Sequence, residues 1–213
     1  NGDVLKDIVY ISDSNSISIL LSEGSGEFAS PIEIDFESEL SNRRIRICDV
    51  GDVDLDGDAD LVVSNFIDMD YPPLEDSTLL FIGLNDGNGN FTFELLPNEF
   101  TAAYRNVKLG DVDGDNILDI LTIGFGYAPQ FAIGIPWYEL PQFVWYKNDG
   151  LGGYVQHNVS LPSRVERLPD IADFQLADLE GDGDSDVFMS YAFRDTCEDE
   201  LHNFNCSFIY VYS

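Results

Sequence analysis

The chain has 213 residues, enough for one substantial hydrophobic core, and it carries 40 acidic against 10 basic side chains, a formal net charge of -30. Because nucleic-acid phosphates and anionic membrane surfaces are bound mainly by Lys and Arg, this balance argues against both as partners. No apolar run is long enough (about 18 residues) to cross a bilayer as a helix, so insertion into a membrane is not expected.

The first part of the chain reads as short β-strands. Apolar residues alternate with polar ones at 7–12, 16–21, 27–34 and 44–50, and clusters of Gly, Ser and Asn separate these runs. Such runs are typical of strands joined by tight turns, and a helical period is weak everywhere in the chain. We therefore expect an all-β fold.

An acidic loop follows the fourth run and occurs three times. The copies are 52–60 (loop 1), 111–119 (loop 2) and 178–186 (loop 3), and each has acids at positions 1, 3, 5 and 9. Position 7 would offer a backbone carbonyl. The candidate ligands are Asp52, Asp54, Asp56, Asp58 and Asp60 in loop 1, Asp111, Asp113, Asp115, Ile117 and Asp119 in loop 2, and Asp178, Glu180, Asp182, Asp184 and Asp186 in loop 3.

This acid spacing predicts calcium. Carboxylates so close together repel one another unless a cation lies among them, and Ca²⁺ takes six to eight oxygen ligands. An EF-hand would need a glutamate at the twelfth position and a following helix, but the twelfth residues are Val63, Thr122 and Met189, in apolar strand-like runs. An acidic turn without metal is the other reading, and it leaves the clustered charge uncompensated. We expect about three calcium sites.

A glycine-rich turn recurs between the acidic loops. It reads Gly83-Leu-Asn85-Asp-Gly-Asn-Gly-Asn-Phe91 and Tyr146-Lys-Asn148-Asp-Gly-Leu-Gly-Gly-Tyr154, and a weaker copy spans 20–28. Asn-Asp-Gly tolerates positive φ angles and predicts a tight hairpin.

The spacing of loop and turn defines a repeat of about sixty residues. The ninth-position aspartates Asp60, Asp119 and Asp186 lie 59 and 67 residues apart, from 119 − 60 and 186 − 119. One period earlier, Asn1, Asp3 and Asp7 form a truncated fourth copy, the candidate ligands of a partial fourth calcium site. This copy favours a processed or partial chain. We predict strands at 60–66, 78–85, 90–96 and 105–111, then at 119–125, 143–148, 154–160 and 171–178, and finally at 186–193 and 207–212.

Four strands per repeat with glycine-rich turns predict a β-propeller of four-stranded antiparallel blades. We expect a single domain over 1–213, with repeats at 1–51, 52–110, 111–177 and 178–213. About three and a half blades are present, to be completed by further chain or another subunit. In this grouping each acidic loop joins one blade to the next.

At these loops and turns the chain resembles the FG-GAP/VCBS repeat family, the calcium-binding propeller repeats of integrin α-subunits and many secreted microbial proteins. The resemblance spans nearly all 213 residues. It implies a calcium-binding, secreted or cell-surface module that binds or adheres to protein or glycan.

Three sequons, Asn90-Phe-Thr92, Asn158-Val-Ser160 and Asn205-Cys-Ser207, also suggest secretion, and Cys197 and Cys206 could close a disulfide. The long segment 124–142 carries Tyr127, Phe131, Trp137 and Tyr138 and is a candidate binding loop, with packing on its own domain as the alternative.

Other functions remain open at this stage. The chain could be a structural subunit of an extracellular filament or sheath, in which neighbouring subunits complete the open blade. It could also be part of a secreted polysaccharide-active enzyme. His157 and His202 are the only histidines, and no catalytic constellation is recognised, so we do not expect an enzyme.

Overall fold

The computed structural model describes residues 3, 5–13, 15–36, 44–66, 79–96, 102–126, 141–159, 170–193 and 206–212. All regular elements in these ranges are β-strands, which confirms the all-β class. Within them, no helix is long and apolar enough to cross a membrane.

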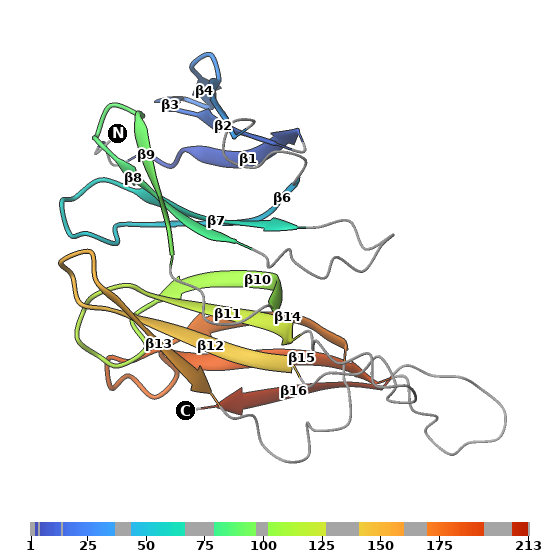
Figure 1. Cartoon of the computed structure of the whole chain (residues 1–213). Helices are drawn as coiled ribbons and strands as arrows, with labels where there is room; N and C mark the ends of the chain where they lie inside the picture. Colours follow the sequence, from blue (N-terminus) through green and yellow to red (C-terminus); the bar gives the residue numbers. More distant parts are fainter. Residues whose placement is uncertain are drawn as a thin grey trace, which may run out of the picture.

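Four antiparallel sheets, named blades A to D, follow one another along the chain. In Figure 1 blade A lies above blade B and blade B above blade C, while blade D overlaps blade C in this view. Blade A contains β1 (Ile8–Asp13), β2 (Ser16–Leu20) and β5 (Ile32–Asp35), with a small hairpin of β3 (Ser22–Gly24) and β4 (Glu27–Phe28) beside it. Blade B contains β6 (Arg44–Gly51), β7 (Asp60–Phe66), β8 (Leu80–Asn85) and β9 (Phe91–Leu95). Blade C contains β10 (Ala102–Gly110), β11 (Asp119–Gly126), β12 (Pro141–Asn148) and β13 (Tyr154–Val159). Blade D contains β14 (Asp170–Ala177), β15 (Asp186–Phe193) and β16 (Cys206–Tyr212).

The central strands of blades B and C are apolar on both faces because each blade packs against two neighbours. In β7, Leu61 and Val63 lie in the core shared with blade A, whereas Val62 lies in the core shared with blade C. In β11, Ile120 faces blade B, whereas Leu121 lies in the core shared with blade D. A continuous apolar run is the sequence pattern of a strand buried on both faces.

The strands that begin blades B, C and D lie next to one another. The N–H of Leu109 in β10 donates to a carboxylate oxygen of Asp49 in β6 at 2.8 Å. Both β6 and β10 end in a glycine. A Cβ at Gly51 would come within 2.6 Å of the Leu118 side chain, and one at Gly110 within 2.6 Å of Leu176. Glycine therefore lets the next blade approach closely. Among the described residues blades B and C have four strands and blades A and D have three. These antiparallel sheets are consistent with propeller blades, and completion into a ring stays a prediction.

The expected grouping of strands into blades is wrong by one strand. Residues 44–50 were grouped with the preceding strands and 105–111 with blade B, but β6 pairs with β7 and β10 pairs with β11. The residues on either side of each acidic loop are direct partners, as in Gly51↔Asp60 and Gly110↔Asp119. Each loop is therefore a hairpin inside one blade, and it does not join two blades.

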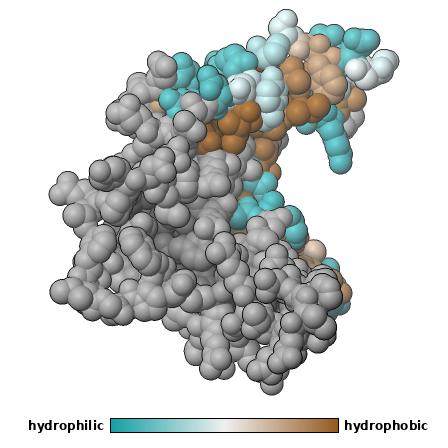
Figure 2. All heavy atoms as spheres, turned by 90° about the vertical axis from the view of Figure 1, so that its right-hand side faces the viewer, coloured by the Kyte–Doolittle hydropathy of each residue, from teal (hydrophilic) through white to brown (hydrophobic). Residues whose placement is uncertain are grey.

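Blade A presents apolar side chains at the surface. In the described part of the chain β1 pairs only with β2, so its other edge is unpaired. Leu5, Ile8, Tyr10 and Ile11 are all exposed by more than a third. Figure 2 shows apolar residues gathered in its upper part, where blade A lies.

Replacing Ile120 with Ala should reduce the free energy of unfolding by about 2–5 kcal/mol, because it opens a cavity in the core between blades B and C. Urea denaturation followed by tryptophan fluorescence measures the change. Val155→Ala, at a position 58% exposed in the same sheet, is the control and should stay within about 0.5 kcal/mol. Equal effects of the two substitutions would contradict the packing of these blades.

Candidate metal centre

The aspartate at position 9 closes each acidic loop. Asp60 is fully buried, and one of its carboxylate oxygens accepts the N–H of Val53, the second residue of the same loop, at 2.9 Å. The same bond recurs from Val112 to Asp119 at 3.2 Å and from Leu179 to Asp186 at 2.9 Å. This contact fixes the start of each loop against its end.

The second oxygen of the closing aspartate holds the glycine-rich turn. Asp60 accepts the N–H of Asn85 at 2.9 Å, and Asp119 accepts that of Asn148 at 2.8 Å. Asp7 accepts the N–H of Ser22 in the same way at 2.8 Å. The truncated copy that ends at Asp7 thus keeps the closing contact, although its Asn1 lies outside the described residues.

The first aspartate of each loop also binds backbone. Asp52 accepts the N–H of Gly57 at 3.1 Å, and the equivalent bonds join Asp111 to Asn116 at 2.7 Å and Asp178 to Gly183 at 3.1 Å. The donors at position 6 have φ angles of 97°, 64° and 105°, a region open mainly to Gly and Asn. All three loops therefore fold alike.

Loop 1 lies in the seam between blades B and C. The side-chain amide of Asn148, from blade C, donates to the carbonyl of Val53 in loop 1 at 2.6 Å and to that of Leu118 at 3.0 Å. Burial, followed by the negative charges of Asp60 and Asp54, raises the pKa of Tyr154 in blade C. A turn of blade C is thus hydrogen-bonded to the acidic loop of blade B.

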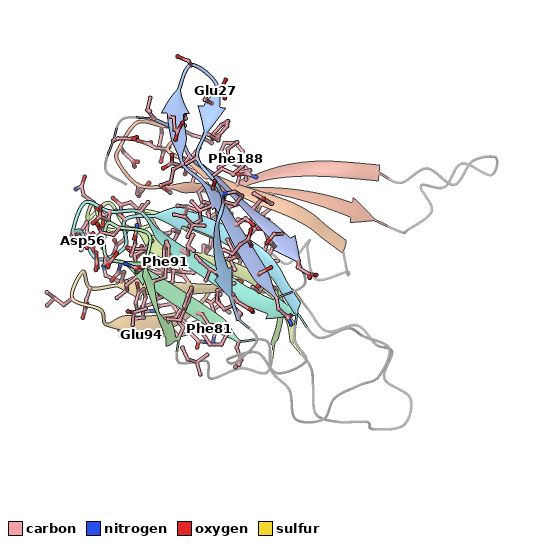
Figure 3. All side chains as sticks on the ribbon, turned by 90° about the horizontal axis from the view of Figure 1, so that it is seen from above. Glu27, Asp56, Phe81, Phe91, Glu94 and Phe188 are labelled. Atoms are coloured by element: carbon pink, nitrogen blue, oxygen red, sulfur yellow. The ribbon has the colours of Figure 1, made fainter. Side chains whose placement is uncertain are left out.

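Three carboxylates converge in loop 1. Oxygens of Asp52, Asp54 and Asp60 all lie within 4.8 Å of one another. Burial raises the pKa of Asp60, and it raises that of Asp54 with help from the charges of Asp56 and Asp52. Oδ1 of Asp52 is buried and has no hydrogen-bond partner. In Figure 3 Asp56 lies at the loop end of the strands. A hard dication would supply the missing partner and balance the charge, so these residues fit calcium.

Loop 2 also brings three carboxylates together, but with a different membership. Oxygens of Asp111, Asp113 and Asp115 lie within 4.8 Å of one another, and Asp119 does not join them. Burial raises the pKa of Asp119. The ammonium of Lys147, in β12, forms ion pairs with Asp113 and Asp115.

Loop 3 is the most open of the three. Asp178, Glu180 and Asp182 are exposed, and only Asp186 is buried. A hydrogen bond between the side chains of Asp182 and Asp184 raises the pKa of Asp184. Loop 3 forms no converging carboxylate group among the described residues.

The other predicted sites are only partly covered by the structure. Asn90 and Asn158 are exposed, as sequons in use would require. Cys206 begins β16, but its side chain lies outside the described residues. Six further predicted site residues lie outside the described residues: Cys197, Asn205, Tyr127, Phe131, Trp137 and Tyr138. The four aromatic residues belong to the segment 127–140, which joins β11 to β12. The ends of these two strands, paired at Phe125↔Pro141, lie opposite loop 2.

Two kinds of residue at the site were not predicted. One is the asparagine that begins each turn. Asn85 donates from its side chain to Ala59 O at 3.0 Å, and its own oxygen accepts the N–H groups of Gly87 and Gly89. Its recurrence at Asn148 was a usable signal. The other is Lys147, 34 residues from Asp113, for which the sequence gives no local signal.

Comparison with known families agrees with this geometry. Residues 1–63 match the model of the FG-GAP-like repeat, a stretch that contains the truncated first loop and loop 1. A search of curated proteins finds no match to the chain. Over residues 1–63, the chain is therefore similar to the FG-GAP-like repeat.

Proposed function

We propose that the chain is a calcium-binding β-propeller module that works outside the cell by binding to protein or glycan. The observation that carries the proposal is the cluster of Asp52, Asp54 and Asp60 around a buried carboxylate oxygen without a partner. Calcium would be held by these carboxylates and by further oxygens of loop 1. Loops 2 and 3 repeat the fold of loop 1 and are the other candidate sites.

The position of loop 1 supports a structural role for the ion. The loop is a hairpin between β6 and β7, and it is hydrogen-bonded both to the turn after β8 and to Asn148 of blade C. An ion bound there would hold two strands, a turn and the next blade together. Because binding occurs only in the folded state, its free energy adds to stability.

An extracellular location is supported by three observations. The family match is to repeats that are usually extracellular, the sequon residues Asn90 and Asn158 are exposed, and the net charge of -30 suits a medium rich in calcium. The segment 127–140 joins the ends of β11 and β12 that lie opposite loop 2, and we propose it as the binding loop.

Removing calcium should lower the melting temperature. At about 100 times its dissociation constant, an ion adds about 2.7 kcal/mol per site, and 1 kcal/mol corresponds to roughly 2–4 °C in a domain of this size. Differential scanning calorimetry in EDTA and in calcium should differ by roughly 5–10 °C per occupied site. Magnesium, with its demand for octahedral geometry, should restore less. Identical melts in EDTA and calcium would refute the proposal.

Replacing Asp54 with Asn should abolish binding at loop 1 without weakening the metal-free protein. The new amide oxygen at position 54 can still accept the N–H of Asp56. The substitution also removes the negative charge of Asp54, which burial and the neighbouring charges of Asp56 and Asp52 disfavour. Calorimetric titration should therefore show one calcium fewer than in the wild type, and the melting temperature in EDTA should be unchanged or higher. The matched control is Glu94→Gln, which removes one charge from exposed β9 and should leave the stoichiometry intact.

The binding role can be tested with the double variant Trp137→Ala and Tyr138→Ala. Aromatic anchors at an interface commonly contribute 2 kcal/mol or more, so binding on a glycan array or to immobilised matrix proteins should fall about 30-fold. Leu151→Ala is the control, since Leu151 is 92% exposed in the turn between β12 and β13. If the control loses binding and the aromatic variant does not, the binding surface lies on the loop face.

A further inference from the structure

Lys147 places a positive charge in loop 2. Its ammonium pairs with Asp113 and lies 3.4 Å from a carboxylate oxygen of Asp115. These are two of the three aspartates whose oxygens converge in this loop. The ammonium therefore lies beside carboxylate oxygens that would coordinate a bound ion.

The equivalent position in blade B has no charge. Lys147 immediately precedes Asn148, which begins the turn of blade C, and Leu84 immediately precedes Asn85, which begins the turn of blade B. Leu84 packs against the core between blades B and C. The position that holds a cation beside loop 2 thus holds an apolar side chain in blade B.

The membership of the two acidic clusters differs accordingly. In loop 1 the buried closing Asp60 converges with Asp52 and Asp54, whereas in loop 2 the closing Asp119 is left out and Asp115 takes part. Asp113 and Asp115 are the two partners of Lys147. The carboxylates of loop 2 are thus arranged around the lysine as well as around one another.

We infer that Lys147 is a built-in counter-ion that competes with calcium for loop 2, so that loop 1 binds calcium more tightly than loop 2. The inference rests on the proposed calcium binding. An ammonium a few ångströms from a dication repels it, which should weaken binding roughly 10- to 100-fold even with strong solvent screening. The flexible stem of Lys147, whose side chain is 37% exposed, allows the ion to displace the ammonium at high calcium.

The decisive variant is Lys147→Met, which keeps the length of the side chain and removes its charge. Calorimetric titration with calcium chloride should show one site strengthened roughly 10- to 100-fold, while the site lost in Asp54→Asn is unchanged. Leu84→Lys is the mirror variant and should weaken the loop 1 site by a similar factor. Circular dichroism checks that both variants fold, and Lys147→Gln replaces Lys147→Met if the latter does not.

The melting temperature gives a second readout, because removing the lysine should destabilise the metal-free protein and increase the stabilisation by calcium. In EDTA the lysine balances the acids of loop 2, so Lys147→Met should melt lower than the wild type. In calcium the variant should gain more stability than the wild type does. If Lys147 had only a structural role, its replacement by Met would lower the melting temperature equally in both buffers. That result would overturn the inference.

The two proposals fail in different ways. Wild-type protein that binds calcium with the same affinity as Lys147→Met overturns the role of Lys147 and leaves calcium binding standing. An absence of binding heat in every protein overturns calcium binding, and the inference with it.

Discussion

The buried carboxylate at the ninth position of each acidic loop is the contact on which the other features of the site depend. In blade B, Asp60 accepts one N–H from the start of its own loop and another from the turn after β8, so a single side chain joins two connections on the same face. Two backbone donors offset only part of the cost of burying a charge, which is why the pKa of Asp60 is raised. A positive charge near this carboxylate would stabilise its ionised form and therefore the fold.

The surroundings of the three loops differ. Loop 1 is hydrogen-bonded to the turn of blade C through Asn148, its closing Asp60 is buried, and Asp52 and Asp54 are half-buried. Loop 2 has a lysine beside it, and loop 3 is largely exposed and shares a hydrogen bond between two of its acids. Three copies with nearly the same sequence pattern are therefore three different electrostatic environments.

The sequence predicted the parts that are local and left open the parts that depend on pairing. Acid spacing and the Asn-Asp-Gly turns identified the loops, and the truncated copy at Asp7 keeps its closing bond to Ser22. The period of a repeat does not show at which strand each blade begins. The expected blades therefore begin one strand too late, and the pairing Gly51↔Asp60 shows that β6 belongs to the same blade as β7. The role of Lys147 is not predicted because its partner Asp113 lies 34 residues away, a distance over which no local sequence pattern indicates a contact.

A tethered lysine and a free calcium ion solve the same electrostatic problem with different consequences. The lysine is present at any calcium concentration, so a loop that it neutralises contributes constant stability. A loop neutralised by calcium contributes only when the ion is supplied, because the gain follows the ratio of free calcium to the dissociation constant. The seam between blades B and C is where loop 1 touches a second blade, and loop 2 has the lysine on its own sheet. Under the proposed calcium binding, the packing of blade B on blade C would depend on the ion, whereas the hairpin of loop 2 has a neutralising lysine without it.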